Sequence, residues 1–411
     1  MNPPTSFSSL PPELVTKICR NPVLRNKDLI ALRLTSKSQG IHLSASEEFA
    51  ERHFTVISLA YTRHSLQTFA EICKHSTFGS AVRKVQLSCV RFIPESLGEE
   101  SKELFDYLWS SPMPQKRREY LDKIRLLVNR CDEEEDLETT GDAGHLLATA
   151  FVALSRWQHP LELSVSTWEF NSTLGLSQIY DLDVLDNNQH WDCDILSTVA
   201  LLLRAAISSK CVVKKLQIQG NIWDNLVDSS ADSLTALAQL PELELDFWST
   251  GERDDPGVTG LDDMVTKLLE NAVNLRVLHL DTFCADRYQN CLDRIFSILP
   301  TMGLEKLKLT NVEIDMFKGF EKRIESLRHL EMDQCEVWDA SLKNVLLSVQ
   351  KHLPRLEYFL VHGISRPWID PKVELEGVQE ISDGIDKLIQ SRQNWLDDPP
   401  EGVIAWDSDE D

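Results

Sequence analysis

Apolar residues near the start of the chain recur at helical spacing and are interrupted by proline. Leu14 and Ile18 lie four residues apart, so they share one face of a helix that begins after Pro12. Proline is compatible with this position because the N–H groups of the first turn have no partner within the helix. Pro22 then breaks the pattern, so the first helix ends before it.

Two further helices are expected after this break. Leu29 and Leu32 are spaced as the apolar face of a second helix, which must pack against the first in a compact hairpin. Ser44 and Glu47 have the spacing of a capping box, so we expect a third helix to begin at Ser44. Residues 1–54 are therefore predicted to form a small helical module.

Seven later segments share the spacing L-x-x-L-x-L, with apolar substitutes at some leucine positions. The alternation predicts a short strand in each, and apolar steps of three and four residues predict helices over 262–269, 291–299 and 341–349. The last five segments start 35, 29, 23 and 29 residues apart, which leaves room for one strand and one helix per repeat. The segments are VRKVQL from Val82, VKKLQI from Val213, LPELEL from Leu240, LRVLHL from Leu275, LEKLKL from Leu304, LRHLEM from Leu327 and LEYFLV from Leu356.

The segments around these repeats also have regular patterns. FTVISLA predicts a strand, and SLQTFAEICKH predicts a helix with Ser65 as its cap. No Gly- or Ser-rich spacer intervenes, so the helical module is expected to pack rigidly on the first repeat. The gap between Val82 and Val213 contains helical patterns in PQKRREYLDKIRLLVNRC and GHLLATAFVALSRW, followed by the alternating LELSV. A final helix is predicted from one apolar stripe, formed by Val378, Ile381, Ile385, Leu388 and Ile389.

The net charge of -23 is concentrated in two segments, and this changes the list of partners to consider. Asp132–Asp142 and Asp397–Asp411 each contain seven acidic and no basic residues. We interpret the first as an exposed acidic loop within an insertion and the second as a solvated tail, with a specific basic partner as the alternative. Nucleic acid is not an expected partner, because its phosphates need clustered Lys and Arg and the best cluster is only Lys116–Arg118.

The N-terminal module has a characteristic order of apolar, proline and charged residues. In SLPPELVTKICRNPVLRNKDLIALRLTSKS this order and its spacing resemble the F-box, a short helical module that binds Skp-type adaptors inside cullin-based ubiquitin ligases. The family often places a large aromatic residue after its Ser-Lys pair, whereas this chain reads SKSQGIHL. An ordinary N-terminal helical cap is the alternative. The resemblance covers roughly Phe7–Phe54 and implies that the adaptor is bound through Leu10, Pro11, Glu13, Leu14, Ile18, Leu24, Leu29, Leu32, Ser36 and Lys37.

The seven repeated segments resemble leucine-rich repeats, which stack into a curved solenoid with parallel strands on the inside. The ninth position of such a repeat is usually Asn or Cys, and here only Asn221 and Cys335 fit. The other five repeats place apolar residues there, so an irregular solenoid is expected. The predicted fold is α/β, with an F-box-like module at 1–54, an irregular solenoid at 55–392 and an acidic tail at 393–411. The alternative is a different α/β fold in which the seven matches are unrelated.

The strand pattern also predicts a surface that could bind a target. Successive strand residues point to opposite sides, so the residues between and after the leucines share one exposed face. An acidic patch at Glu242, Glu244 and Asp246 lies two strands from Lys306 and Lys308, which favours a target with a basic segment. The alternative is that targets dock on the loops or on the insertion before Val213. The candidate residues are Gln217, Gln219, Glu244, Asp246, His279, Asp281, Lys308, Thr310, Glu331, Asp333, Tyr358 and His362.

Signals for other kinds of function are missing from the sequence. There is no P-loop, G-x-G-x-x-G, G-x-S-x-G or H-E-x-x-H, so we expect neither an enzyme nor a cofactor or metal. No apolar run approaches about 18 residues, and the N-terminus has no basic region followed by an apolar stretch. We therefore expect neither membrane insertion nor secretion, and nine reduced cysteines in an intracellular protein of the cytoplasm, the nucleus or both.

The two resemblances together imply a non-enzymatic substrate receptor. The F-box-like module would bind a Skp-type adaptor, and through it cullin, while the repeat region would bind a protein target of unknown identity. The alternative is a repeat-containing scaffold or assembly protein without a ligase role.

Overall fold

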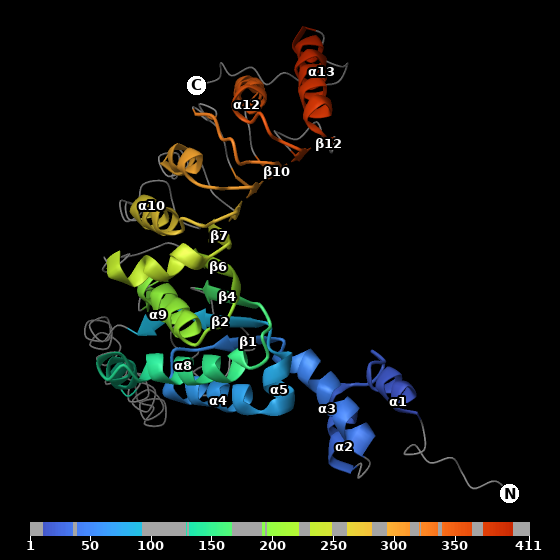
Figure 1. Cartoon of the computed structure of the whole chain (residues 1–411), viewed down its shortest axis with the longest axis vertical. Coiled ribbons are helices and arrows are strands. Elements are labelled where there is room, and N and C mark those ends of the chain that lie inside the picture. The colour runs from blue at the N-terminus through green and yellow to red at the C-terminus, as the bar shows by residue number, and fades with distance from the viewer. Residues whose placement is uncertain are drawn as a thin grey trace, which may run out of the picture. The chain divides into compact units, whose positions relative to one another are not determined.

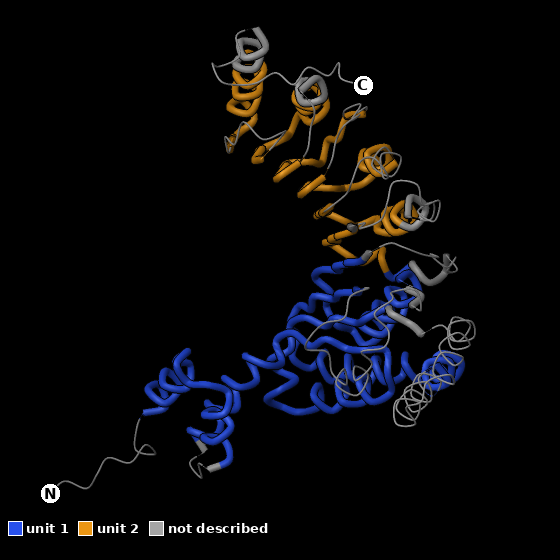
Figure 2. The backbone as a smooth tube through the Cα atoms, turned by 180° about the vertical axis from the view of Figure 1, so that it is seen from behind, with its two compact units in different colours: residues 1–236 blue, residues 237–411 orange. Residues whose placement is uncertain are grey.

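The structure is a computed structural model that divides into two compact units, Met1–Ala236 and Leu237–Asp411 (Figure 2). Both units combine helices with mostly parallel strands, which confirms the α/β class. The residues that the structure describes are 11–35, 39–92, 129, 131–166, 191–193, 195–221, 231–248, 261–281, 294–312, 320, 322–335, 339–363 and 373–397.

Unit 1 begins with three helices, α1 (Pro12–Cys19), α2 (Asn26–Thr35) and α3 (Gln39–Phe54) (Figure 1). The predicted start of the third helix at Ser44 is wrong, because Ser44 lies inside α3. Its hydroxyl Oγ is instead 3.2 Å from Oγ1 of Thr16 on α1. A capping-box spacing therefore occurs here within a helix, where it serves the packing of α3 against α1.

Among the described residues of unit 1, four parallel strands pair in the order β1-β2-β4-β6. Each presents an apolar side chain at the same level, and these four side chains are buried: Ile57, Val85, Leu163 and Leu216. A separate antiparallel pair is formed by β3 (Val90–Phe92) and β5 (Trp191–Cys193). The bounds of the sheet strands are β1 Val56–Leu59, β2 Lys84–Ser88, β4 Leu161–Ser166 and β6 Val213–Asn221.

The helices between these strands pack on one another. Phe69 of α4 and Phe151 of α8 meet edge to face, with ring centroids 6.0 Å apart, and both side chains are fully buried. The predicted cap of α4 at Ser65 is wrong, because the side chain of Thr62 accepts the hydrogen bond from Ser65 N. The helices are α4 (Arg63–Lys74), α5 (Ser76–Ala81), α8 (Asp142–Ser155) and α9 (Ile195–Ser208), followed by the 3-10 helix η4 (Ala231–Gln239).

In its described ranges, unit 2 contains five parallel strands and one antiparallel strand, in the order β7-β8-β9-β10-β11-β12. The helices of this unit lie in one layer beside the strands (Figures 1 and 2). The strands are β7 (Glu242–Trp248), β8 (Val277–Asp281), β9 (Lys306–Thr310), β10 (His329–Asp333), β11 (Tyr358–His362) and β12 (Val373–Glu376), and the helices are α10 (Leu261–Asn271), η6 (Leu299–Thr301), α12 (Asp339–His352) and α13 (Val378–Asp397), with residues 294–298 also helical.

All seven segments predicted to be strands are strands, and their apolar residues are in register. Leu243, Leu278, Leu307, Leu330 and Phe359 occupy one level of five adjacent strands, and each is 0% exposed. Burial of such side chains stabilises the fold by about 1.5–3 kcal/mol each, so this row fixes the register of the sheet. Strand β12 was not predicted, and α13 extends past the expected boundary at residue 392.

A common turn ends three neighbouring strands of unit 2. Asn311, Gln334 and Gly363 directly follow β9, β10 and β11, and all three have left-handed backbone, with φ of 52°, 53° and 62°. Asn311 N donates to Asp333 O, and Gln334 N donates to His362 O, so the ladder continues through the turn. The next described residue points inward and is buried in two cases, Val312 and Cys335.

Cys335 occupies the ninth repeat position in which Asn or Cys was expected. Its Sγ donates to Leu309 O at 3.5 Å, and burial raises the pKa of this thiol to about 12. The thiol therefore stays neutral in the core. The apolar plug expected in place of a polar residue is seen at Val312, which is 0% exposed.

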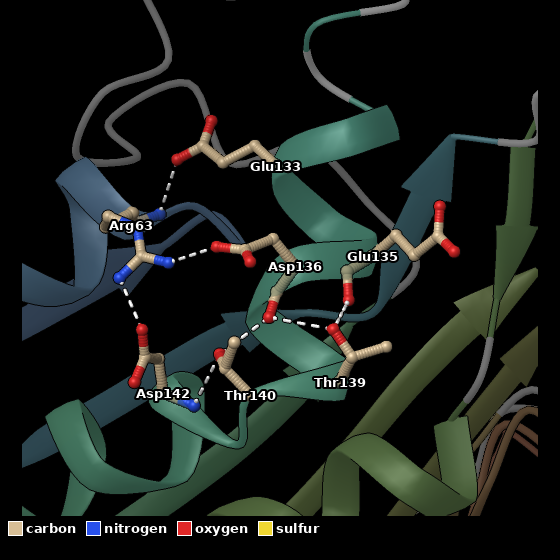
Figure 3. Close-up of polar contacts among 7 residues, drawn as sticks. All are labelled: Arg63, Glu133, Glu135, Asp136, Thr139, Thr140 and Asp142. Atoms are coloured by element: carbon tan, nitrogen blue, oxygen red, sulfur yellow. Dashed lines mark hydrogen bonds and ion pairs between the residues drawn. The ribbon is translucent and has the colours of Figure 1, made fainter.

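The acidic run predicted to be an exposed loop is mostly helical. Residues 131–139 form a helix, and Glu134 within it is only 5% exposed. Arg63, at the start of α4, binds this segment with both its side chain and its backbone (Figure 3). Its guanidinium lies 2.6 Å from Asp136 Oδ2 and 2.6 Å from Asp142 Oδ2, and its backbone N–H donates to Glu133 Oε1 at 2.9 Å.

This cluster predicts a pH dependence of stability. The hydrogen bond from Arg63 lowers the pKa of Asp142, so the stabilisation is present above the pKa of an unfolded Asp, about 3.9, and is lost as pH falls through the lower folded value. We expect Arg63→Gln to lower the free energy of unfolding at pH 7. Between pH 5 and pH 3, the free energy of unfolding of this variant should fall less than that of the native chain. The effect should be small, because the Arg63 and Asp142 side chains are 34% and 41% exposed.

Chemical denaturation at about pH 7, 5 and 3 measures the difference in the free energy of unfolding between the variant and the native chain. Arg156→Gln, an exposed cation at the end of α8, is the matched control. Parallel pH profiles for the native chain and Arg63→Gln would contradict a role for this cluster in stability.

Candidate protein-binding surfaces

The three-helix module α1–α3 has a small core of its own. Val15, Cys19, Leu29, Ile41 and Ala45 are buried in it, and each is at most 4% exposed. On α1 the buried residues are thus four apart, but they are Val15 and Cys19 rather than Leu14 and Ile18. The apolar face of α1 that meets α3 is therefore rotated by one residue from the face marked by Leu14.

Several apolar residues of the module lie outside this core and are exposed, and we call them the exposed apolar set. Leu34 on α2 is 81% exposed, Leu14 on α1 48% and Ile30 on α2 39%. Ile30 and Leu34 are one helical turn apart and share a face of α2. Val23, between α1 and α2, and Leu43 on α3 are also exposed. Such a concentration within three short helices is typical of a protein-binding surface.

A single arginine ties the helices of the module together. Arg52, near the end of α3, donates from its guanidinium to Leu24 O at 2.6 Å and to Asn21 O at 3.3 Å. Its Nε also lies 2.7 Å from Glu48 Oε1. These contacts satisfy carbonyl groups in the connection between α1 and α2, which fixes the position of both helices against α3.

Aromatic contacts join the module to helix α5. The rings of Phe54 on α3 and Phe78 on α5 are stacked at 4.7 Å, and the guanidinium of Arg33 on α2 lies 5.2 Å from the ring centroid of Phe78. Only Thr55 separates α3 from β1. The module is therefore packed on the rest of unit 1 without a flexible linker, as the sequence predicts.

The predicted adaptor-binding residues that the structure describes fall into three groups. Pro11, Glu13 and Leu14 are exposed, whereas Ile18, Leu24 and Leu32 are half-buried. Leu29 is 0% exposed and belongs to the module core, so it is not part of the exposed surface of the module. Leu10, Ser36 and Lys37 lie outside the described residues.

Sequence reasoning missed the exposed residues Ile30 and Leu34. Ile30 and Leu34 are four residues apart, which is helical spacing, but the F-box-like motif includes Leu29 and Leu32 instead. These two leucines lie on another face of α2.

The second candidate is the strand face of unit 2, the set of outward side chains of β7–β12. These side chains are half-buried on the parallel strands and exposed on β12. Among the outward side chains that the structure describes, the set is polar except at Val277 and Leu360, and it carries eight carboxylates against two lysines. Its polar members are Glu242, Glu244, Asp246, His279, Asp281, Lys306, Lys308, Thr310, His329, Glu331, Asp333, Tyr358, His362, Glu374 and Glu376.

Histidines bridge neighbouring strands of this face. His279 Nδ1 lies 3.4 Å from Glu244 Oε2, and its Nε2 lies 3.0 Å from Thr310 Oγ1, so it links β7, β8 and β9. His362 Nδ1 lies 2.7 Å from Asp333 Oδ1. These contacts hold the outward side chains in defined positions across the strands.

Glu331 is the centre of a second group of contacts. Its Oε1 lies 2.7 Å from Lys306 Nζ and 2.6 Å from His329 Nε2. Partial burial alone would raise the pKa of Glu331, but the hydrogen bonds from Lys306 and His329 outweigh it and lower the pKa. Glu331 is therefore ionised at neutral pH and engaged within the surface.

Tyr358 forms an aromatic platform beside this group. Its ring stacks on His329 with centroids 4.1 Å apart and planes 12° apart, and its OH donates to Glu374 Oε1 at 3.0 Å. Burial raises the pKa of Tyr358 to about 12, and the hydrogen bond to Glu374 acts in the same direction. The hydroxyl therefore stays protonated and orients Glu374 on the edge strand.

The predicted target-binding residues of unit 2 are all on this face. Glu244, Asp246, His279, Asp281, Lys308, Thr310, Glu331, Asp333, Tyr358 and His362 share it in the predicted register. Gln217 and Gln219 are half-buried on β6 of unit 1, where Gln217 Oε1 accepts from Lys84 Nζ at 2.7 Å. The candidate list did not include His329, although its outward position follows from the alternation in LRHLEM, and sequence reasoning missed Glu374 and Glu376.

Neither surface shows the arrangement of a metal site. Within the described ranges, no group of three or more His, Cys, Asp or Glu side chains could hold a metal ion. Among the helices that the structure describes, none is both long and apolar enough to cross a membrane.

Comparisons with known proteins add no assignment to this geometry. No model of a known protein family matches the sequence, and no curated protein matches it either.

Proposed function

We propose that this chain is the substrate-recognition subunit of a cullin-based ubiquitin ligase. In this proposal α1–α3 bind a Skp-type adaptor, and the strand face of unit 2 binds a protein target. No catalytic step is assigned to the chain, because a receptor acts by holding its target near the transferring enzyme.

The observation that carries the proposal is the exposed apolar set of the three-helix module. Leu14, Ile30 and Leu34 are exposed and are not part of the core formed by the buried residues of the module. Their side chains are therefore available to a partner. The F-box-like order of residues in the same helices favours a Skp-type adaptor as that partner. The close packing of α3 on α5 would let the module orient the rest of unit 1 on the adaptor.

Adaptor capture by the full chain tests the proposal. Alanine at both Pro11 and Leu14 should weaken binding of a purified Skp-type adaptor by about 2–4 kcal/mol, or roughly 30- to 1,000-fold, the scale of lost interface anchors. Val212→Ala with Val273→Ala removes equally exposed apolar side chains elsewhere and should leave capture unchanged.

Co-purification then separates a ligase receptor from a scaffold. A receptor should bring down cullin together with the adaptor, whereas a scaffold without a ligase role should not. Unchanged adaptor capture by the Pro11 and Leu14 variant, with native-like folding, would remove the F-box assignment.

A further inference from the structure

The charges of the strand face of unit 2 alternate across the strands. Strands β7 and β8 carry Glu242, Glu244, Asp246 and Asp281, and on the other side β10 and β12, which flank β11, carry Glu331, Asp333, Glu374 and Glu376. Between them, β9 has no carboxylate on this face, and its outward residues are Lys306, Lys308 and Thr310. The face therefore has an acidic, a basic and a second acidic zone.

Lys308 is the member of the central zone that remains for a partner. Lys306 is occupied, because its Nζ binds Glu331 Oε1 at 2.7 Å. Lys308 lies in one row with His279 and Glu331, but Glu331 is already engaged by Lys306 and His329. Among the described residues, the Lys308 ammonium has no hydrogen bond or ion pair. A half-buried cation in this position is complementary to a carboxylate from outside.

We propose that the strand face binds an extended protein segment in which two basic clusters flank one acidic residue. The basic clusters would meet the two acidic zones, and the acidic residue would meet Lys308. This inference rests on the proposed function, since it describes the target that the receptor holds. The sequence alone favours a target with a basic segment, and the strand face specifies how basic and acidic residues are arranged in that segment.

The spacing of the strands sets the spacing of this pattern. Neighbouring strands are about 4.8 Å apart. The first acidic zone is centred between β7 and β8 and the second on β11, about three and a half strand spacings away, so the two centres are separated by about 17 Å. An extended chain advances about 3.3 Å per residue, so the centres of the two basic clusters lie about five residues apart. The acidic residue falls midway, which a segment such as Arg-Arg-Gly-Glu-Gly-Arg-Arg satisfies.

Three labelled peptides and the full chain test the pattern by fluorescence anisotropy. The peptides are RRGEGRR, RRGKGRR with the central charge reversed, and EEGKGEE with all charges reversed. The native chain should prefer RRGEGRR over RRGKGRR by about threefold to tenfold, the range of a partly buried charge pair, and should bind EEGKGEE weakest. Binding of RRGEGRR should weaken with salt.

Charge reversal at Lys308 provides the decisive comparison. In Lys308→Glu the preference should invert, so that RRGKGRR binds better than RRGEGRR, and in Lys308→Gln the preference for RRGEGRR should be lost. A general attraction between an acidic protein and basic peptides would leave the preference of the variants the same as in the native chain. That outcome would overturn the proposal, as would unchanged binding of RRGEGRR to Glu244→Lys combined with Asp333→Lys.

The same variants keep this inference separate from the proposed function. Adaptor capture is measured for each of them and should stay native, because none lies in α1–α3. A lost peptide preference with intact adaptor capture refutes the charge pattern alone. A correct preference in a chain that captures no adaptor refutes the ligase assignment and leaves the binding surface in place.

Discussion

Gly79→Ala is expected to destabilise unit 1 by about 3 kcal/mol or more, the upper range for overpacking. His75 alone separates α4 from α5, and its Nδ1 accepts from the backbone N–H groups of Thr77 and Phe78. This junction brings Gly79 so close to α4 that a Cβ would lie 2.3 Å from the carbonyl oxygen of Cys73. Backbone rather than a flexible side chain would have to move.

Gly40→Ala is the matched control for this substitution. Gly40 lies in α3, and a Cβ there would meet no atom within 4 Å. It should stabilise the chain by about 0.5–1 kcal/mol, because Ala loses less backbone freedom in a helix than Gly. Equal midpoints of chemical denaturation for the two variants would show that α4 and α5 do not meet as closely as described.

Leu29→Ala is expected to destabilise the three-helix module by about 2–5 kcal/mol, since Leu29 is 0% exposed in its core. Its neighbour Ile30 is 39% exposed, and Ile30→Ala should cost less than about 1 kcal/mol of stability. Hydrogen exchange of the α1–α3 amides measures the local effect in the full chain. The pair thus separates a residue that holds the module together from one that faces outward.

Adaptor capture is a second measurement that distinguishes Leu29→Ala from Ile30→Ala. Leu29→Ala should lose capture in parallel with loss of amide protection, whereas Ile30→Ala should keep its protection whatever its effect on capture. Full protection in Leu29→Ala would contradict the position of this residue in the core.

The strands of unit 2 could be predicted from sequence because alternation has a period of two that a buried face enforces. Leu278 and Leu280 had to point inward, which left His279 and Asp281 outward, and the structure has this arrangement. Strand β12 escaped prediction because VELE is short and charged, and it pairs antiparallel at the end of the sheet, where no repeat marks it.

Helical faces were harder to predict because a shift of one residue moves a side chain by only about 100° around the helix. Leu14 and Val15 are both apolar, as are Leu29 and Ile30, and only tertiary packing decides which member of each pair is buried. The exposed members are the candidates for binding, so the site was predicted less well than the fold.

The acidic helix shows a different limit of sequence reasoning. A run of carboxylates indicates solvation unless a cation compensates for it, and the cation here is Arg63, about 70 positions earlier in the chain. Nothing in the local pattern around Asp136 points to that residue. Likewise, the cap of α4 could be either Thr62 or Ser65 by residue type, and the backbone geometry selects Thr62.

The alternation of inward and outward side chains in unit 2 also separates two demands on its evolution. The leucines of β7–β11 make the core, whereas His279, Lys308 and Glu331 can be exchanged without changing any of those leucines. New specificities can therefore arise on the same backbone through substitutions that leave the inherited core intact. Descendants of one gene could in this way diverge in the partners they recognise while keeping a common fold.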